Sequence, residues 1–540
     1  MRKGLLKGLA IISTGALLLT SVSVGTVRGK ASAESDEAST EIDNTYNAVF
    51  TRNDGLIKKH FEDSDGNRII FNKKKDNNDS GKKRGLLKAS TLPESYDATD
   101  NYVTSIKDQG YTGSCWSFSM MKTLEATAIK EGYETKDSAD FSESHLVYYS
   151  YFRNTDSSDS TYGDCNYLTS SASDACTYPY MIGGSVGIGG PVLLRGTGIA
   201  SESSFPFSAD SNSELEDMGE SMEAYGASEY YHIDNYRLTG FKDYSYSDAD
   251  EIKQALIDNG VLTAALYYDT KYLKTTSDSY DVNSCYYQNL YTETDEDSDD
   301  YAPYYADHAV TLIGYDDNYP ASNFKNTPAG NGAWLIANSH GTNASDDNGY
   351  FWLSYYDASF SDIYSMQIEK KDFADDIFQY DGNGYGDVNE SSGSMTLANI
   401  YENSSDTTKY IHSAGIYTVE DNQSCIINVM KNPAADMSSG DIIEDAYTVL
   451  EGDKSGFYTV PLTKAVAIEP GESFAILVTY MSNGGTVYYP IEGQTQSYRD
   501  SDYGTVKFAF ASKAEQSFYY SRNRWSDSYY KTYNNFCIKG

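Results

Sequence analysis

The sequence predicts several folded units, the last of which is an all-β antiparallel sandwich. At about 100–200 residues per domain, a chain of 540 residues is long enough for about two to four units. From about residue 372, short runs of β-forming residues alternate with turns rich in Gly, Asn, Asp and Ser, as in paired antiparallel strands. Ahead of them, a helical pattern begins at Cys115. We expect strands at residues 395–401, 411–419, 425–430, 446–450, 457–461, 473–480 and 506–511.

The first 33 residues are predicted to be a signal peptide. Arg2, Lys3 and Lys7 precede an apolar run over residues 9–19, and residues 31–33 (Ala-Ser-Ala) form a small-residue cleavage site. The apolar run is shorter than the ~20 residues that a membrane-spanning helix needs, so a membrane anchor is the less favoured alternative. We therefore expect a secreted, extracellular protein of the kind that bacteria export.

Acidic residues dominate the body of the chain. The 79 Asp and Glu outnumber the 41 Lys and Arg, and the formal net charge is −38. This excess excludes a nucleic-acid binder held by phosphate contacts and argues against docking on anionic lipid. Residues 34–90 differ, because basic clusters at 73–75 and 82–84 precede the acidic body. We interpret residues 34–90 as a propeptide that docks by charge attraction and is then cut off; a solvated linker is an equal alternative.

Cys115 opens the most informative stretch of the sequence. Gln109 and Gly113 precede it in a loop, and apolar residues then recur at three- and four-residue steps up to Ala128, ahead of Gly132. Cys115 is therefore expected at the amino terminus of a helix, where the helix dipole lowers a thiol pKa and favours the thiolate. A thiolate nucleophile needs an imidazole and an oxyanion donor, and the Gln109 amide lies on the preceding loop.

Five sequence blocks in this order resemble the papain-type cysteine peptidases. They are Gln109 with residues 113–116, residues 141–146, His308 ahead of residues 309–315, residues 332–341 around Asn338, and residues 349–351. The resemblance covers roughly residues 92–357. It implies an α+β papain-like fold, with a helical left lobe and a β-barrel right lobe, in a peptidase domain over residues 91–371. It also implies that catalysis needs no metal and no organic cofactor.

The resemblance implies a role for each matched residue. Cys115 is the expected nucleophile, His308 the general base and acid, and Asn338 the residue that orients the imidazole. The Gln109 amide and the backbone N–H of Cys115 are expected to form the oxyanion hole.

Substrate contacts also follow from the resemblance. Gly183 and Gly184 match the glycine pair whose backbone pairs with an extended substrate in this family. We therefore expect protein or peptide substrates, with the chain's own propeptide as an inhibitor.

Three features depart from the family pattern. Thr112 replaces a usual cysteine, so one family disulfide is absent. His340 stands two residues after Asn338, where a tryptophan normally shields the asparagine–histidine hydrogen bond, so we expect a wetter triad. His340 is also an alternative base, but His308 ahead of an apolar strand is the better match. An acidic run at residues 292–300 is either a solvated loop or a site for calcium or basic substrates.

The cysteines other than Cys115 allow at most two disulfides, and an exported chain permits them. Cys165–Cys176 would close a local loop, and Cys425–Cys537 would clasp the C-terminal region. The connectivity stays open at this point.

The C-terminal domain, residues 372–540, resembles the lectin-like domain that follows papain-type peptidases in some clostridial cell-wall proteins. The matching runs are residues 380–381, 398–401 and 413–417. The resemblance implies contact with a glycan or the cell wall, a wall-associated location and a bound structural calcium, with no individual ligand named. A purely structural partner of the peptidase is an equal alternative.

We therefore expect a secreted cysteine endopeptidase, made as a proenzyme, that hydrolyses peptide bonds through an acyl-thioester intermediate. One alternative is a catalytically inactive papain-like fold that acts as a cell-surface or glycan-binding module. Another is an enzyme with the same triad that transfers acyl groups to amines or trims single residues from peptide ends.

Overall fold

The computed structural model describes most of the chain after residue 91 and parts of the segment before it. The described residues are 42–53, 56–62, 68–69, 92–152, 157, 159–168, 178–226, 236–274, 285–286, 306–342, 347–370, 376–482, 485–493, 496–500 and 504–540. They belong to one compact unit, Thr40–Gly540. The predicted signal peptide, the basic clusters at 73–75 and 82–84, the acidic run at 292–300 and Cys176 lie outside the described residues.

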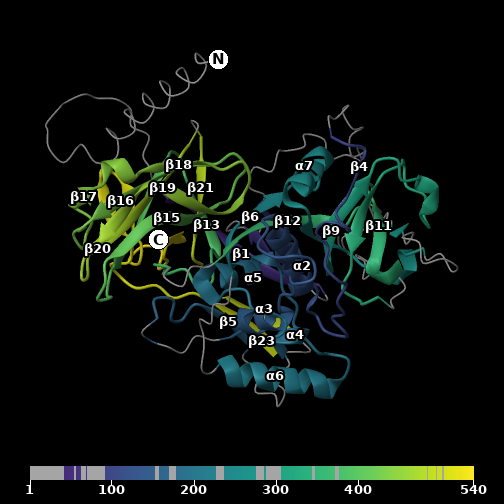
Figure 1. Ribbon diagram of the computed structural model, residues 1–540. Helices are drawn as coiled ribbons and strands as arrows, with labels where there is room; N and C mark the ends of the chain where they lie inside the picture. The colour runs from purple at the N-terminus through teal and green to yellow at the C-terminus, as the bar shows by residue number, and fades with distance from the viewer. Residues whose placement is uncertain are drawn as a thin grey trace. The chain divides into compact units, whose positions relative to one another are not determined.

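The α-helices precede the C-terminal domain and the strands form four sheets (Figure 1). The α-helices of the described residues are α2 (Cys115–Lys130), α3 (Glu143–Ser150), α4 (Tyr178–Met181), α5 (Val186–Val192), α6 (Asn212–Gly226) and α7 (Ala249–Asn259). The largest sheet runs in the order β26 (Ile538–Lys539), β15 (Lys409–Thr418), β19 (Gly456–Ile468), β6 (Tyr236–Tyr244), β12 (Ser361–Lys370), β7 (Leu262–Leu266), β9 (His308–Asp316), β10 (Ala333–Ala337), β11 (Tyr350–Ser354) and β8 (Cys285–Tyr286), with β4 (Ser95–Asp97) also paired with β9.

Each of the other three sheets contains strands of the C-terminal domain. The second is β17 (Asp441–Ile442), β16 (Ser424–Lys431), β20 (Ser473–Tyr480), β14 (Met395–Glu402), β24 (Ser517–Ser521) and β25 (Arg524–Asp527), with β18 (Thr448–Glu451) on β16. The third is β21 (Val487–Ile491), β13 (Asp387–Ser391), β1 (Ile42–Asn53), β2 (Leu56–Glu62) and β3 (Arg68–Ile69). The fourth is β22 (Gln496–Asp500), β23 (Gly504–Ala509) and β5 (Cys165–Leu168).

The C-terminal strands form a sandwich around a core of their own. Apolar side chains of β14, β16 and β20 meet those of β15 and β19 in one buried cluster, which includes Leu397, Ile416, Ile427 and Ile476. Alternation along β16, where every second side chain is buried, gives each strand one inward face. Neighbouring strands in these C-terminal sheets are antiparallel. The predicted all-β antiparallel sandwich is therefore confirmed.

One sheet continues from the first domain into the second. Strand β6 of the first domain pairs antiparallel with β19 of the second, with Phe241 opposite Phe457 (Figure 1). Gly456 permits the approach, because an added Cβ would lie 2.0 Å from the Phe241 carbonyl oxygen and its φ is +151°. A second link joins β5 to β23. The expected strand at 506–511 is thus present as β23, but it pairs with β5 rather than with the sandwich sheets.

Helix α2 is fixed to the large sheet by hydroxyl groups. Ser119, Thr123 and Thr127 lie four residues apart, and therefore share one face of the helix. The Ser119 hydroxyl donates to a carbonyl of β9 over 2.7 Å, and the Thr127 hydroxyl donates to a carbonyl of β12 over 3.1 Å. Thr123 hydrogen-bonds with Thr263 of β7 over 2.8 Å. These bonds fix the helix, and with it Cys115, over the strands that carry the other site residues.

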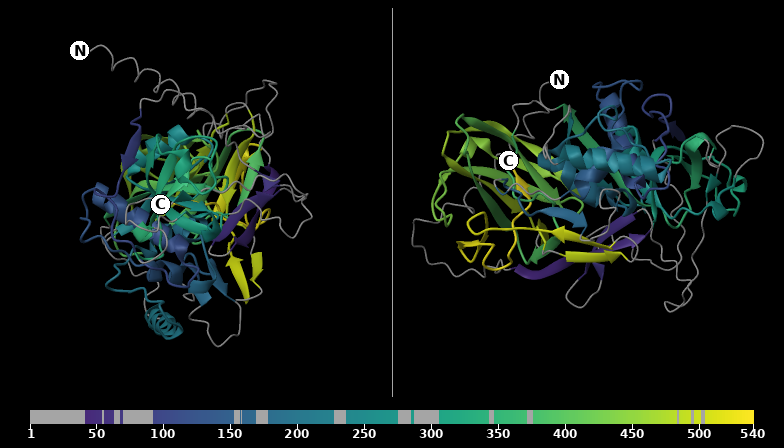
Figure 2. Two further views of the ribbon diagram at one scale, coloured as in Figure 1. Left: turned by 90° about the vertical axis from the view of Figure 1, so that its right-hand side faces the viewer. Right: turned by 90° about the horizontal axis from the view of Figure 1, so that it is seen from below.

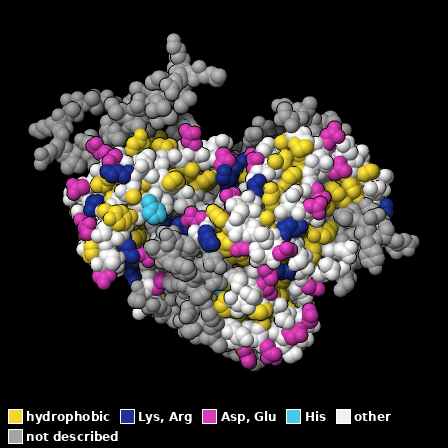
Figure 3. All heavy atoms as spheres, in the orientation of Figure 1, with side chains coloured by type: hydrophobic (Ala, Val, Ile, Leu, Met, Phe, Trp, Pro, Cys, Tyr) yellow, Lys and Arg dark blue, Asp and Glu magenta, His cyan; other side chains and the backbone are white. Residues whose placement is uncertain are grey.

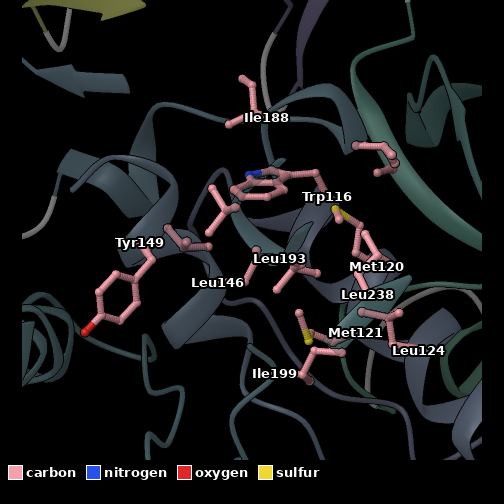
Figure 4. Packing of buried hydrophobic residues seen from close by; sticks show 14 of the residues in the cluster. Trp116, Met120, Met121, Leu124, Leu146, Tyr149, Ile188, Leu193, Ile199 and Leu238 are labelled. Atoms are coloured by element: carbon pink, nitrogen blue, oxygen red, sulfur yellow. The ribbon is translucent and has the colours of Figure 1, made fainter. Parts of the chain in front are cut away.

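Another face of α2 is apolar. Trp116, Met120 and Leu124, again four residues apart, are fully buried and pack against α3, α5 and β6 (Figure 4). Gly184 lies against the Trp116 ring so closely that an added Cβ would be 2.2 Å from it. The helix ends as expected, because Gly132 has the left-handed φ of +74° that favours glycine.

The predicted propeptide contributes strands to the third sheet. Strand β1 pairs antiparallel with β13, with Tyr46 opposite Val388, and β2 pairs with β1 (Figure 2). Backbone pairing with β13 is therefore one contact that holds the predicted propeptide against the C-terminal domain. The basic clusters, on which the expected charge attraction rests, lie outside the described residues. Acidic side chains are spread over the face seen in Figure 3, with basic ones among them.

The expected Cys425–Cys537 clasp is wrong, because Cys425 is a free thiol. Its side chain is fully buried in the apolar core of the sandwich, where it packs as a small hydrophobic residue. Burial also raises its pKa, so the thiol stays protonated. The Cys165–Cys176 pairing stays a prediction, since Cys176 lies outside the described residues.

Candidate active site

Cys115, His308 and Asn338 come from three elements that meet at one place. Cys115 is the first residue of α2, and His308 is the first residue of β9. Asn338 follows the last residue of β10, which pairs antiparallel with β9 and places Ala337 opposite Thr311. Because antiparallel neighbours begin and end at the same edge, the start of β9 and the end of β10 lie side by side.

Hydrogen bonds connect these three residues. The backbone N–H of Ala309 donates to Cys115 Sγ over 3.4 Å, so the thiol lies beside the residue that follows His308. His308 Nε2 and Asn338 Oδ1 are 2.6 Å apart. The three side chains are almost completely buried, with exposed fractions of 1% for Cys115, 7% for His308 and 2% for Asn338.

The Asn338 amide fixes the tautomer of His308. The Ser339 backbone N–H donates to Asn338 Oδ1 over 2.9 Å, and a backbone N–H can only donate, so this atom is the amide oxygen. An amide oxygen can only accept, so the proton in the His308–Asn338 bond sits on His308 Nε2. The other ring nitrogen of His308 is then the basic one, free to take a proton from the thiol.

Gln109 is held in a fixed orientation near Cys115. Its Oε1 accepts from the Ser339 hydroxyl over 2.6 Å, and its Nε2 donates to the Thr112 carbonyl over 2.7 Å. Its backbone N–H also donates to the Ser339 carbonyl over 2.8 Å. An amide nitrogen carries two hydrogens, so a second donor remains for a ligand oxygen.

The two glycines expected at the substrate edge lie beside the nucleophile loop. An added Cβ on Gly113 would be 2.8 Å from the Met181 carbonyl and 3.1 Å from the Gly183 nitrogen. The Gly113 N–H donates to the Tyr180 carbonyl over 2.9 Å, which ties the two loops together. Gly183 has a φ of +90°, a conformation that glycine adopts without strain. Gly183 and Gly184 are therefore brought to the same site as Cys115.

Lys107 anchors the loop that carries Gln109. Its ammonium lies 2.8 Å from the Asp140 carboxylate, 3.1 Å from that of Glu143 and 3.5 Å from that of Glu125. Burial lowers the pKa of Lys107, but the carboxylates of Glu143 and Glu125 raise it by more, so the lysine stays charged. Its carbonyl accepts from the Gly341 N–H over 3.1 Å, which connects this loop to the segment after Asn338.

Burial determines the protonation states of Cys115 and His308 in the structure. It raises the pKa of Cys115 to about 12, against the lowering effect of the Ala309 N–H. Burial, with a smaller contribution from charge on the neighbouring His340, also lowers the pKa of His308 to about 3. The expected lowering of the Cys115 pKa at the helix terminus is therefore wrong for this structure, because burial outweighs the backbone N–H donors.

A family model named Papain family cysteine protease matches residues 92–370, more than half of the chain. This chain belongs to the papain family of cysteine proteases. A second model, Lectin like domain, matches residues 377–540.

Curated relatives match a little under half of this chain. The cathepsin L-like proteinase of Fasciola hepatica is 23% identical over 258 residues, which cover 46% of this chain and 57% of the relative. The viral cathepsin of Adoxophyes honmai nucleopolyhedrovirus is 26% identical over 266 residues, covering 48% of this chain and 56% of the relative. The chain thus spans a little over half the length of these curated relatives.

Two solved structures share the whole architecture. One is the clostridial cysteine protease Cwp84 after propeptide cleavage, with a TM-score of 0.62 and 24% identity, covering 82% of this chain and 98% of that chain. The other comprises the cysteine protease and lectin-like domains of Cwp84, a surface layer associated protein of Clostridium difficile. It has a TM-score of 0.64 and 22% identity, covering 92% of this chain and 98% of that chain. The predicted papain-like fold with a C-terminal β-domain is confirmed.

The papain-family resemblance predicted one feature wrongly. We expected a wetter triad because His340 replaces the shielding tryptophan, yet Asn338 and His308 are buried. The reason is that His340 stacks on His308, with ring centroids 4.9 Å apart and planes 26° apart. Tyr268 adds a third ring, 5.2 Å from His308 and 5.5 Å from His340.

Sequence reasoning missed two residues of this papain-family site. Ser339 contacts both Asn338 and Gln109, and only its place next to Asn338 could have drawn attention to it. Tyr268 lies two residues beyond β7, whose last residue, Leu266, pairs with His308. Strand pairing across 40 residues has no local signal, so Tyr268 could not be found from the sequence alone. His145, which lies in the matched block at residues 141–146, is buried against the rings of Tyr149 and Phe205.

Proposed function

We propose that this chain is a secreted cysteine endopeptidase, made as a proenzyme, that hydrolyses peptide bonds through Cys115, His308 and Asn338. The observation that carries the proposal is that the Cys115 thiol lies beside the backbone of Ala309, while the adjacent His308 hydrogen-bonds to Asn338. The Ala309 N–H lies 3.4 Å from the thiol sulfur, and His308 Nε2 lies 2.6 Å from Asn338 Oδ1. This is the nucleophile, base and orienting group of a triad.

The first half of the reaction uses both sides of the site. The thiol proton moves from Cys115 to the basic nitrogen of His308, and the thiolate attacks the carbonyl carbon of the substrate. Because one proton transfer makes both charges together, neither has to be buried alone. The oxyanion accepts from the Gln109 amide and from the backbone N–H of Cys115, which as the first residue of α2 has no acceptor within the helix. The imidazolium then protonates the leaving amine, and the acyl group stays on sulfur.

The second half restores the enzyme. His308 takes a proton from water, and the resulting hydroxide attacks the thioester carbonyl. The tetrahedral intermediate collapses, the carboxylic acid leaves, and the proton returns from His308 to the thiolate. Asn338 keeps Nδ1 as the basic nitrogen of His308 throughout, because its oxygen accepts the hydrogen of His308 Nε2.

An extended protein or peptide segment is the substrate that this site favours. Gly183 and Gly184 lie beside the Gly113 loop, and glycine leaves room for a substrate backbone to approach. No cofactor enters these steps. The structural calcium expected in the C-terminal domain stays a prediction, since the described residues contain no group of three or more His, Cys, Asp or Glu arranged to hold a metal ion.

The proposal assigns residues 1–33 to a signal peptide, 34–90 to an inhibitory propeptide, 91–371 to the peptidase domain and 372–540 to the lectin-like domain. Pairing of β1 with β13 supports a propeptide that docks on the body of the protein. In the part of the chain that the structure describes, no helix is both long and apolar enough to cross a membrane. Secretion, with contact to a glycan or the cell wall through residues 372–540, is the location that we propose.

The test is intact-mass analysis of the full chain with and without a thiol-reactive epoxide peptide, together with cleavage of a denatured protein substrate. Wild type should gain one adduct and cleave internal bonds, and Cys115→Ala should do neither. Cys425→Ala is the matched control, because it removes a buried thiol outside the site and should behave as wild type.

Each other outcome selects an alternative. Folded wild-type protein that takes up no probe and cleaves nothing would favour an inactive cell-surface or glycan-binding module. Labelling with release of single terminal residues would indicate a trimming enzyme. Product conjugates formed only with added amine would indicate acyl transfer.

A further inference from the structure

His340 stands at the end of a hydrogen-bond chain that starts at the base. Asn338 Oδ1 accepts from His308 Nε2, and Asn338 Nδ2 lies 3.1 Å from His340 Nδ1. The Ser339 N–H has already fixed which end of the amide is oxygen. The amide nitrogen can only donate, so His340 Nδ1 must accept and therefore carries no proton. In this arrangement His340 is a neutral imidazole with its hydrogen on Nε2.

The same residue covers one face of the base. The His308 and His340 rings are stacked at 4.9 Å, and His340 is half-buried rather than sealed from water. Tyr268 packs against both rings. A tryptophan at this position would cover the His308–Asn338 hydrogen bond and would stay neutral at every pH. Histidine, in contrast, is the side chain whose charge ordinarily changes between about pH 5 and 8.

We propose that His340 is a positioning residue that holds Asn338 when neutral and switches the triad off when it is protonated. This inference rests on the proposed function. It gives the site a second titrating histidine that never touches the substrate and acts through Asn338 and His308.

Protonation of His340 has two consequences. Its Nδ1 becomes a donor and faces the Nδ2 donor of Asn338, so this hydrogen bond is lost and one of the contacts that orient the amide is replaced by a repulsion between two donors. A positive charge then lies over the face of His308, where catalysis requires an imidazolium. Like charges disfavour one another, so a charged His340 adds to burial in lowering the pKa of His308.

Asp108, in the loop before α2, lies next to His340. It forms a backbone bridge with His340, and its carboxylate lies 2.7 Å from where a Cβ on Gly341 would be. Asp307, just before β9, accepts from the Tyr268 backbone N–H over 2.7 Å, and the Tyr268 ring packs against His340. A nearby carboxylate would favour a charged His340, and a charged His308 opposes it.

The experiment compares mature wild type with His340→Asn, which supplies a neutral acceptor, and His340→Trp, which supplies a neutral ring. His412→Asn, at an exposed histidine of the C-terminal domain, is the matched control. The measurements are kcat and KM for an internally quenched peptide and the rate of Cys115 alkylation by iodoacetamide, each from pH 4 to 8. Thermal melting identifies any variant that does not fold. If one of the two His340 variants is unfolded, the other one tests the proposal.

Wild type and His412→Asn should lose kcat about tenfold per pH unit on the acid side, with little change in KM. In both His340 variants this acid limb should move down by at least one pH unit, so that kcat at pH 5, relative to its plateau, rises about tenfold. Alkylation of Cys115 should shift in parallel. Folded His340 variants that keep the wild-type acid limb would overturn the proposal.

A second readout separates this inference from the proposed function. Long-range proton–nitrogen NMR of the histidine rings in the full chain should show His340 Nδ1 unprotonated at pH 8, and should show it gaining a proton as the Asn338 amide signal shifts. The same NMR result is expected even if wild type cleaves no substrate and Cys115 is not alkylated at any pH. Those two failures would defeat the proposed function but not this inference. A proton on His340 Nδ1 at pH 8 would defeat the inference.

Discussion

Ser339 joins the Gln109 side of the site to the Asn338 side: its hydroxyl donates to Gln109 Oε1 over 2.6 Å, and its backbone N–H donates to Asn338 Oδ1 over 2.9 Å. We predict that Ser339→Ala lowers kcat about 10- to 100-fold, because the Gln109 amide loses the partner that sets its orientation. KM should change little. Ser405→Ala is the control, since its hydroxyl bonds to Asn403 in the C-terminal domain and should leave kcat unchanged. An unchanged kcat in folded Ser339→Ala would mean that Thr112 alone orients the amide.

Gln109→Ala should separate oxyanion stabilisation from nucleophile reactivity. Loss of one oxyanion donor costs about 10²- to 10³-fold in kcat in well-studied enzymes, and we expect the same range here. Alkylation of Cys115 by iodoacetamide passes through no oxyanion, so its rate should stay within about twofold of wild type. A parallel fall in both rates would show that Gln109 supports the position of Cys115 rather than the oxyanion.

Gly184→Ala should destabilise the fold at the substrate edge. The new Cβ would lie 2.2 Å from the buried Trp116 ring, and overpacking of this kind costs about 1–3 kcal/mol in the free energy of unfolding. Urea unfolding followed by tryptophan fluorescence measures it. Gly187→Ala is the matched control, because its Cβ would meet no atom closer than 3.6 Å and it lies in α5. Equal stability of the two variants would contradict the close packing of Gly184.

Stability should fall with rising pH because of a cluster of buried carboxyl groups. Asp164 hydrogen-bonds with Glu492, and Asp381 lies 3.0 Å from the Lys539 ammonium. Burial raises the pKa of Asp381 to about 6, and it also raises the pKa values of Asp164 and Glu492. The folded state therefore holds more protons than the unfolded state above about pH 4. The free energy of unfolding then declines as pH rises through 6, by about 1.4 kcal/mol for each unit of pKa shift.

Thermal melting between pH 5 and 8 checks this prediction. Glu492→Gln should melt at a higher temperature than wild type at pH 8 and should show a weaker pH dependence, because one titrating group is gone. Glu444→Gln, at an exposed position, should follow wild type. A Glu492→Gln variant that follows the wild-type melting temperature at every pH would contradict these shifts.

The parts of the fold that were predictable from sequence are those with a local pattern. Helix α2 and strand β9 follow from residue spacing within about 15 positions, and so Cys115 and His308 were placed correctly at their first residues. Pairing of β6 with β19, more than 200 residues apart, leaves no such pattern. The pKa of Cys115 was mispredicted for a related reason, since it depends on how much solvent the whole fold excludes.

Because one sheet runs continuously across β6 and β19, we expect neither domain to be well behaved as a separate protein. A peptidase domain without residues 377–540 would expose the β6 edge next to Phe241, which now pairs with Phe457. Exposed edge strands with apolar side chains recruit other strands, so such a fragment should self-associate. The lectin-like domain alone would leave β19 open in the same way. The β6–β19 pairing therefore makes each domain depend on the other for protection against aggregation.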